Sequence, residues 1–188
     1  MIEGLGPGAS EQDPASWVGA METALAAAFR EARIDAKKVV SLGVSGQQHG
    51  FVPLDAKGRP IRPAKLWNDT STIRETEDIV DALGGREKMI SRLGIGLAVG
   101  FTASKILWLK RHEPRNFEKL ATVLLPHNYL NFYLTGRARM EYGDASGTGL
   151  MDIRRLRWDE KAANAVDPGL AGKLPPLSHP REPVGFMK

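Results

Sequence analysis

Polar side chains suited to a neutral, hydroxyl-rich ligand follow an apolar run near residue 40. The residues SGQQHG at 45–50 come directly after the apolar residues 39–44. Amide and imidazole groups donate and accept hydrogen bonds without a fixed charge, so Gln47, Gln48 and His49 suit hydroxyls and a carbonyl better than a phosphate. The residues alone leave a second interpretation equally open, in which one glutamine satisfies a local backbone group and His49 caps the strand.

A second candidate group lies at residues 66–69, which read LWND. The indole face of Trp67 could pack against the C–H surface of a sugar, while Asn68 and Asp69 could bind its hydroxyls. A large aromatic residue after apolar ones is also typical of a core, and Asp69 could instead cap the helix that follows. Both interpretations stay open for this segment.

Two further segments combine polar residues with glycine: GFTASK at 100–105 and DASGT at 144–148. Phe101 is the expected wall of a pocket. Thr102 could cap the following helix, and Lys105 could steer anionic groups, although a lysine in a first helical turn is more often solvated. Residues 144–148 could equally form a capped turn before a strand.

Metal and nucleic-acid sites have little support in the sequence. His112, His127 and His179 stand far apart, with no carboxylate at ligand spacing, which argues against a zinc site. The basic residues RRLR at 154–157 could contact nucleic acid, but three arginines in one polar turn usually form a solvated face. We therefore expect no nucleic-acid partner.

The composition is that of a globular protein that can bury a core. The 188 residues are 42% hydrophobic and 26% charged, and the net charge of +4 is weak support for a polyanionic partner. The absence of cysteine excludes disulfides and thiol chemistry. No apolar run approaches the ~20 residues that span a bilayer. We therefore expect a soluble, cytoplasmic protein without a membrane partner.

The spacing of apolar residues predicts strands followed by helices, which is typical of an α/β protein. Asp13 and Pro14 predict a helix start, and an apolar stripe predicts an amphipathic helix over 14–33 that covers another element. The apolar residues 38–45 predict a central strand buried on both faces, and residues 1–12 a loop. The remaining expectations are a hairpin at the edge of a sheet with Gly58 at positive φ (51–61), helices at 71–83, 86–93, 102–112, 126–135 and 158–166, and strands at 123–125 and 148–153.

Taken together, the four polar segments resemble those of the FGGY carbohydrate kinases, most closely the xylulokinases, and the similarity runs from residue 11 to the Pro-rich tail. The chain departs from many bacterial members at Gln48, where they carry methionine, and at Ser104, where they carry proline. The resemblance implies an α/β, ribonuclease-H-like N-terminal lobe of the actin-like ATPase and sugar kinase type. It further implies that this lobe is incomplete and lacks its first hairpin strands. Residues 1–188 would then be a partial N-terminal sugar-binding domain, with the C-terminal nucleotide-binding domain absent.

The same resemblance implies a function for the full-length protein: ATP-dependent phosphorylation of a ketopentose, most closely of D-xylulose to D-xylulose 5-phosphate. The catalytic Asp of the family is expected beyond Lys188, so no catalytic, cofactor-binding or metal-binding residue is assigned in this chain. ATP and Mg²⁺ belong to the full-length enzyme, and the isolated fragment is expected to be inactive. The residues implied to bind the substrate are Gln48, His49, Trp67, Asn68, Asp69 and Phe101, with 144–148 shaping the floor between two lobes.

Two alternatives stay open. One is a kinase for another sugar or polyol, such as ribulose, gluconate or glycerol, and the other is a non-catalytic remnant that binds a sugar or a partner. The expected partners are a small sugar and the rest of the kinase chain. An apolar strand at 38–45 without neighbouring strands would expose its edge, so we also expect self-association.

Overall fold

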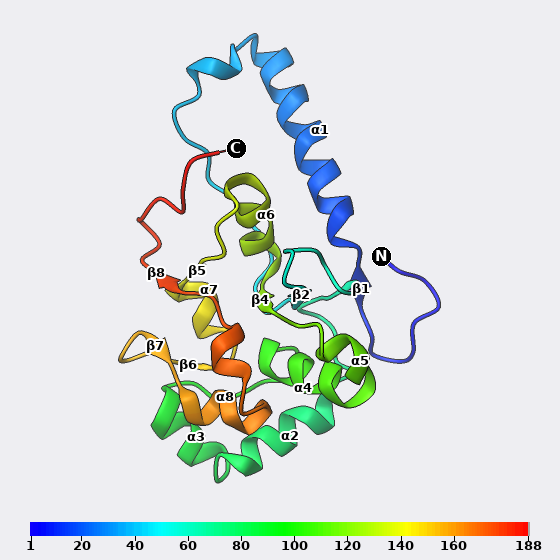
Figure 1. Ribbon diagram of the computed structural model, residues 1–188, viewed down its shortest axis with the longest axis vertical. Coiled ribbons are helices and arrows are strands. Elements are labelled where there is room, and N and C mark those ends of the chain that lie inside the picture. Colours follow the sequence, from blue (N-terminus) through cyan, green and yellow to red (C-terminus); the bar gives the residue numbers. More distant parts are fainter. Residues whose placement is uncertain (188) are drawn as a thin grey trace.

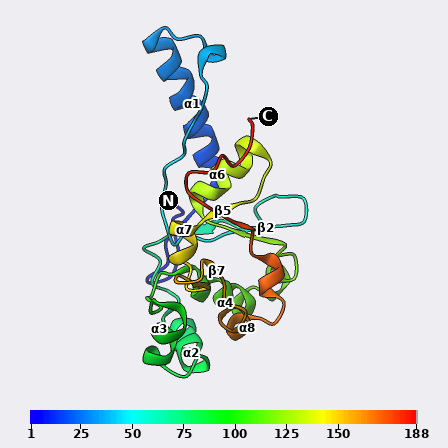
Figure 2. The ribbon, with the colours of Figure 1, turned by 90° about the vertical axis from the view of Figure 1, so that its left-hand side faces the viewer.

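A helical body and a projecting arm make up the chain in the computed structural model, which describes residues 1–187 (Figures 1 and 2). The arm is α1 (Pro14–Ala32), which points away from the body and is followed by the short 3₁₀ helix η1 (Ala36–Lys38). α6 (Pro126–Thr135) lies beside the lower part of this arm. The helices of the body are α2 (Ile73–Ala82), α3 (Arg86–Leu93), α4 (Thr102–His112), α5 (Pro114–Phe117), α7 (Tyr142–Ser146) and α8 (Glu160–Val166), with the 3₁₀ helix η2 at Leu170–Lys173.

The largest apolar cluster lies among the helices of the lower body. Ile79 on α2 and Leu83 directly after that helix stand four residues apart, and Ile106 and Leu109 stand three apart on α4, so each helix gives one apolar face to this cluster. Ile79, Ile106 and Leu109 are completely buried. The cluster fixes the position of α4, whose first turn carries residues of the candidate site.

Short strands pair in four two-stranded sheets within residues 1–187. This mixture of strands and helices confirms the predicted α/β class. Three of the pairs are antiparallel and the pair of β5 with β8 is parallel. The pairs are β1 (Glu11–Gln12) with β3 (Ala64–Lys65), β2 (Val52–Leu54) with β4 (Thr122–Leu124), β5 (Met140–Glu141) with β8 (Leu177–Ser178), and β6 (Met151–Asp152) with β7 (Arg157–Trp158).

Most predicted helices are confirmed within one or two residues. Asp13 accepts a hydrogen bond from the Ala15 N–H at the start of α1, and Pro14 occupies the first helical position. Gly84 and Gly85, both at positive φ, separate α2 from α3. The predicted strand at 148–153 is shorter than expected, and the helix predicted from 158 begins at Glu160.

The predicted central strand at 38–45 is wrong. Residue 38 ends η1, the residues after it form no strand, and Val40 is 98% exposed. A strand needs a neighbour that bonds to its backbone, and no backbone–backbone hydrogen bond joins residues 40–47 to the rest of the described chain. Within residues 1–187 the apolar run is covered only in part: Leu42 and Val44 are half-buried beside α1 and α6.

The expectation of a loop over residues 1–12 is also wrong at its end. Glu11 belongs to β1 and is 4% exposed, because β3 and Asp69 bind this part of the backbone. The stripe of α1 is covered less than predicted: Pro14 is its only fully buried described residue, while Trp17 and Val18 pack on a small cluster beneath the helix.

The hairpin at 51–61 is confirmed in its turn and corrected in its place. The Asp55 N–H donates to the Arg59 carbonyl, and Gly58 has φ 75°. However, β2 is buried, with β4 on one side and a bridge from Leu54 to Pro60 on the other. Strand β2 therefore lies inside the body, where the Pro53 carbonyl accepts from the Ile61 N–H, while the turn is exposed at Ala56, Lys57 and Arg59.

Candidate functional site

His49 is the centre of the candidate site. Its backbone has φ 60°, a left-handed conformation that is uncommon for a residue with a side chain. The imidazole stacks on Phe101, with ring centroids 4.4 Å apart, and its Nδ1 lies 2.7 Å from the Gly147 carbonyl oxygen. A Cβ at residue 147 would collide with this imidazole, so the observed position of the ring depends on glycine there. The site thus joins three of the four predicted segments around one ring.

Lys105 lies beneath His49 and is completely buried. Its Nζ donates to the His49 carbonyl at 2.7 Å and to the Gly100 carbonyl. Burial lowers the pKa of Lys105 to about 7, although Asp69 opposes the shift. The expectation that Lys105 steers anions or is solvated is wrong. Thr102 does not cap α4 either, since its hydroxyl donates to the His49 carbonyl at 3.4 Å.

The backbone of Trp67 contacts the loop that carries Phe101. Gly100, at φ 95°, packs so closely on the Trp67 carbonyl that a Cβ would lie 2.6 Å from its oxygen. The Trp67 side chain is 58% exposed and the side chain of Asn68 is exposed as well. The segment at 66–69 therefore adjoins the Phe101 loop and presents an open indole and an open amide.

The glutamines before His49 differ in their surroundings. Gln48 is exposed, and its Nε2 donates a long bond of 3.5 Å to the Gly143 carbonyl. Gln47 is half-buried, and its Oε1 is buried without a hydrogen-bond partner among the described residues. Gln48 therefore lies next to the segment at 143–148, which closes the site on this side, whereas Gln47 lines a hollow near α6.

Asp69 is buried and its carboxylate is saturated by the protein. Its Oδ2 accepts from the Ser10 N–H and from the Lys65 Nζ, both at 2.9 Å, and its Oδ1 accepts from the Ser71 hydroxyl at 2.6 Å and the Ser71 N–H at 3.1 Å. Burial opposes ionisation, but the bonds from Ser71, Ser10 and Lys65 hold the pKa of Asp69 below its ordinary value. A carboxylate has about four lone-pair positions, and these bonds fill them. These contacts favour a structural role for Asp69, in the turn before α2, over direct contact with a ligand.

A buried charge network surrounds Asp69, and sequence reasoning missed it. Glu11 pairs with Arg62 at 2.7 Å and with Lys65 at 3.3 Å, and Lys65 pairs with Asp69. The Lys65 Nζ also lies 4.0 Å from the centre of the Trp108 ring, a cation–π contact. The spacing of Lys65 and Asp69 was the only local signal, because Glu11 approaches them only in the folded chain.

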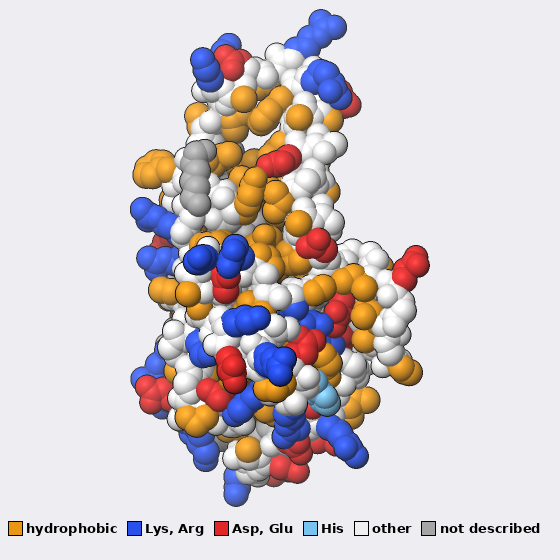
Figure 3. All heavy atoms as spheres, turned by 45° about the vertical axis from the view of Figure 1, so that its right-hand side comes forward, with side chains coloured by type: hydrophobic (Ala, Val, Ile, Leu, Met, Phe, Trp, Pro, Cys, Tyr) orange, Lys and Arg blue, Asp and Glu red, His pale blue; other side chains and the backbone are white. Residues whose placement is uncertain are grey.

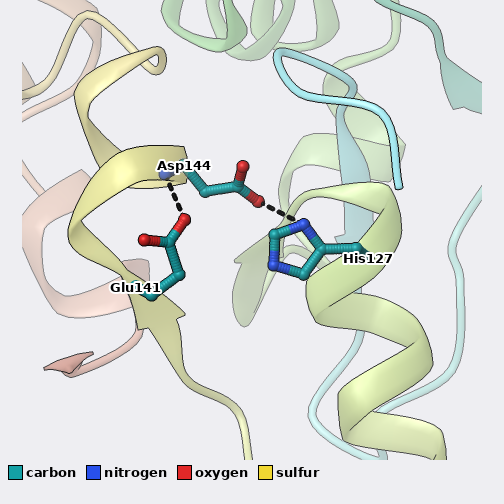
Figure 4. Close-up of side chains that lie close together, drawn as sticks. All are labelled: His127, Glu141 and Asp144. Carbon is teal, nitrogen blue, oxygen red and sulfur yellow. Dashed lines mark hydrogen bonds and ion pairs between the residues drawn. The ribbon is translucent and has the colours of Figure 1, made fainter. Parts of the chain in front are cut away.

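His127, Glu141 and Asp144 form a second polar cluster (Figure 4). His127 Nδ1 lies 2.8 Å from Asp144 Oδ2, which corrects the expectation that no carboxylate accompanies this histidine. Glu141 accepts from the N–H groups of Gly143 and Asp144 and so caps α7. Mg²⁺ prefers six oxygen ligands in near-octahedral geometry, which one imidazole and an engaged cap do not supply. The cluster instead ties α6 to α7.

An apolar hollow of about 480 Å³ lies between α1, residues 42–47 and α6. Figure 3 shows hydrophobic side chains gathered in this upper part of the molecule. Its walls include Met21, Leu25, Leu42 and Leu130, whereas His49, Trp67 and Phe101 do not line it. A hydroxyl-rich ligand fits the polar surface around His49 better than this hollow.

A family assignment follows from comparison with known proteins. The family described as "FGGY family of carbohydrate kinases, N-terminal domain" matches residues 3–188. The chain belongs to the FGGY family. No helix within residues 1–187 is both long and apolar enough to cross a membrane.

Several relatives of this FGGY domain are xylulose kinases. That of Haemophilus influenzae is 37% identical over 96% of this chain and 38% of its own length, and that of Bacillus subtilis is 37% identical over 96% and 36%. A crystal structure of a Brucella ovis "xyloylose kinase" superposes with a TM-score of 0.92 at 33% identity, over 100% of this chain and 38% of that one. Plasmodium falciparum glycerol kinase with ADP superposes with a TM-score of 0.85 at 25% identity, over 100% and 38%. The chain thus spans well under half the length of these relatives and has the sugar kinase N-terminal fold.

Proposed function

We propose that this chain forms the sugar-binding wall of a longer FGGY kinase, which transfers the γ-phosphoryl group of ATP to a hydroxyl of D-xylulose and yields D-xylulose 5-phosphate. The observation that carries this proposal is the His49–Phe101 ring pair, with Gln48 and Trp67 beside it at the meeting point of four segments. The xylulose kinase names of several relatives support the choice of sugar.

The chemistry of the site suits a small sugar. A backbone carbonyl only accepts, so His49 must donate from Nδ1 to Gly147, which leaves Nε2 of the neutral ring as an acceptor for a sugar hydroxyl. The exposed amide of Gln48 both donates and accepts. The exposed indole of Trp67 offers an apolar face for the C–H side of the sugar.

Phosphoryl transfer also needs a carboxylate base, Mg²⁺ and donors for the phosphates. Asp69 is saturated and Asp144 faces His127, so neither is available as the base. We propose that the base and most of the groups that bind ATP and Mg²⁺ come from parts of the longer kinase that this chain does not span. The role of this chain is then to bind and orient the sugar. We also propose that the full-length protein is cytoplasmic.

The assignment is tested with His49→Ala in the full-length protein. We expect the KM for D-xylulose to rise at least about tenfold, because the variant loses both the ring stack and the acceptor. His179→Ala removes an exposed histidine near the chain end and should leave the kinetics unchanged. Unaltered kinetics in His49→Ala would refute the site.

A second candidate is a kinase for another polyol, favoured by the superposition on glycerol kinase. A panel of D-xylulose, D-ribulose, D-gluconate and glycerol against the full-length protein separates these substrates. A non-catalytic remnant is the other rival, and calorimetry of the 188-residue chain with D-xylulose tests it. Millimolar or tighter binding by the chain alone supports the remnant.

We also propose that the isolated chain self-associates. Residues 40–47 have no backbone–backbone hydrogen bonds within the described chain, and they carry the exposed Val40. Unpaired extended backbone next to an apolar hollow is a surface on which a second copy can add a strand.

A further inference from the structure

One buried amine joins the two loops that carry the stacked rings. The Lys105 Nζ donates to the carbonyl of His49 at 2.7 Å and to the carbonyl of Gly100, the residue directly before Phe101. Lys105 is in the first turn of α4, and the helix is held in the core by Ile106 and Leu109. The amine is therefore attached to a helix that is anchored in the apolar core.

We propose that Lys105 is a positioning residue of the sugar site: without touching the ligand, it holds the backbone of His49 and Gly100 so that the imidazole and the Phe101 ring stack. This inference deepens the proposed function and rests on it, since it takes the His49–Phe101 pair as the wall that meets the sugar. The contacts that link the Lys105 amine to the ring pair are observed in the structure and do not depend on the proposed function.

The backbone of His49 needs such support. A left-handed φ of 60° is unfavourable for a residue with a Cβ. A hydrogen bond from the Gly50 N–H to the Gln48 carbonyl, 2.7 Å long, closes a tight turn around His49 and directs its carbonyl inward. There the carbonyl accepts from Lys105, with Thr102 as a weaker second donor at 3.4 Å. The amine thus fixes the turn that aims the imidazole.

The bond from Lys105 to the Gly100 carbonyl affects Phe101 and Trp67 as well. Gly100 has φ 95° and packs on the Trp67 carbonyl, so the position of Gly100 determines the backbone positions of Phe101 and Trp67. An apolar side chain at residue 105 could fill the volume, but it would leave two buried carbonyls without their donor. The need to hold these two carbonyls therefore explains why a lysine is buried at this position, whereas the need to fill space does not.

Ion pairing does not explain why Lys105 is buried at this position. Asp69 and Lys65 are the charged groups that act on it, and Lys65, not Lys105, forms the ion pair with Asp69. The ordered contacts of the Lys105 Nζ are the two carbonyls. Its removal should consequently disturb the loops more than the charge network.

The test uses Lys105→Met in the full-length kinase, with Lys110→Met as a matched control. Lys110 lies on the same helix and also donates to a backbone carbonyl, that of Val166, but at the far end of α4. We expect the KM for D-xylulose to rise about tenfold or more in Lys105→Met while the KM for ATP stays within about twofold. Lys110→Met should change neither constant. An unchanged sugar KM in folded Lys105→Met would overturn the role.

A second readout reports on geometry without substrate. In protein labelled with ¹³C at histidine Cε1, the stack on Phe101 should shift the His49 signal upfield, and His49→Asn assigns that signal. We expect Lys105→Met to lose the upfield shift and Lys110→Met to keep it. A retained shift in Lys105→Met contradicts the positioning role even if activity falls.

Misfolding of Lys105→Met and failure of the proposed function would each give a different result. If circular dichroism shows that Lys105→Met does not fold, Lys105→Gln replaces it, since the shorter amide cannot reach both carbonyls at once and should give the same changes in the KM and the NMR shift. Unchanged values in Lys105→Gln also overturn the role. If the wild-type protein phosphorylates none of the sugars, the proposed function fails, whereas the NMR comparison still decides whether Lys105 orders the ring pair.

Discussion

The imidazole of His49 lies parallel to the ring of Phe101, with 8° between their planes and 4.4 Å between their centroids. The two residues come from different loops, and each is fixed from behind by the backbone contacts of its own segment. Because Nδ1 is engaged by the Gly147 carbonyl, Nε2 is the ring nitrogen of this stack that a ligand can use.

Phe101→Leu should weaken sugar binding. The substitution removes the stack but keeps an apolar side chain, so we expect the KM for D-xylulose to rise about five- to tenfold in the full-length enzyme. Phe117→Leu is the control, because Phe117 packs on the same apolar cluster away from His49. Equal sugar KM values in the two variants would show that the ring has no part in binding.

Gly147→Ala should displace His49. The added Cβ would collide with the imidazole, so the ring must leave its contact with the Gly147 carbonyl. We expect a loss of kcat/KM for D-xylulose of at least about tenfold. At Gly172 nothing lies within 4 Å of an added Cβ, and Gly172→Ala should be neutral. Full activity of Gly147→Ala argues against the observed placement of His49.

Stability should depend on pH through Lys105. The pKa of Lys105 is about 7 in the folded chain and returns toward its ordinary value of 10.5 on unfolding. Above about pH 10.5 the amine is neutral in both states. As the pH falls toward 7, only the unfolded state takes up the proton, so the free energy of unfolding decreases by at most about 1.4 kcal/mol per pH unit. Below pH 7 this loss is complete.

Urea denaturation at pH 6, 7.5 and 9 of wild type, Lys105→Met and Lys110→Met measures this effect. Wild type and Lys110→Met should gain stability from pH 7.5 to 9 relative to Lys105→Met. Parallel pH profiles for all three proteins would show that the Lys105 amine does not change its protonation in this range.

Asp69→Asn should destabilise the fold. The variant removes the shorter of the two ion pairs of the buried Lys65, whose other partner is Glu11 at 3.3 Å, and breaking a buried pair typically costs about 3–5 kcal/mol. Asp78→Asn removes the half-exposed partner of Arg111 and should cost less than about 1 kcal/mol. Urea denaturation compares the two variants, and similar costs would contradict the structural role of Asp69.

Val40→Lys should reduce self-association of the isolated chain. Val40 is 98% exposed beside unpaired backbone, so a charge there opposes strand addition. Analytical ultracentrifugation over a hundredfold range of concentration compares the variant with wild type and with Val99→Lys, a control at another exposed valine. A wild-type chain that is monomeric throughout excludes the proposed association.

The sequence predicted the helices well where local signals define them. Gly84, Gly85 and Pro114 bound α2, α3 and α4, and the bounds of α3 and α4 agree with the prediction. The run at 38–45 was misjudged because an apolar pattern shows what a strand would look like, while a strand also needs a partner for its backbone. That partner is a tertiary property.

The candidate site was predictable in its segments but not in its contacts. The polar residues at 45–50 and the glycine-flanked Phe101 pointed to the ring pair. Lys105 was misjudged because its acceptors are backbone carbonyls, which no side-chain pattern reveals. The pairing of His127 with Asp144 was missed for a similar reason, since only the folded chain brings α6 and α7 together.

The unpaired stretch at 40–47 is the natural place for a protease to cut, but a cut there need not release the N-terminal piece. β1 stays paired with β3, and the Ser10 N–H stays bonded to Asp69. The chain would then behave as two complementing fragments, with the arm retained by the noncovalent contacts before α1 and by the packing of Trp17 and Val18 on the small cluster beneath it.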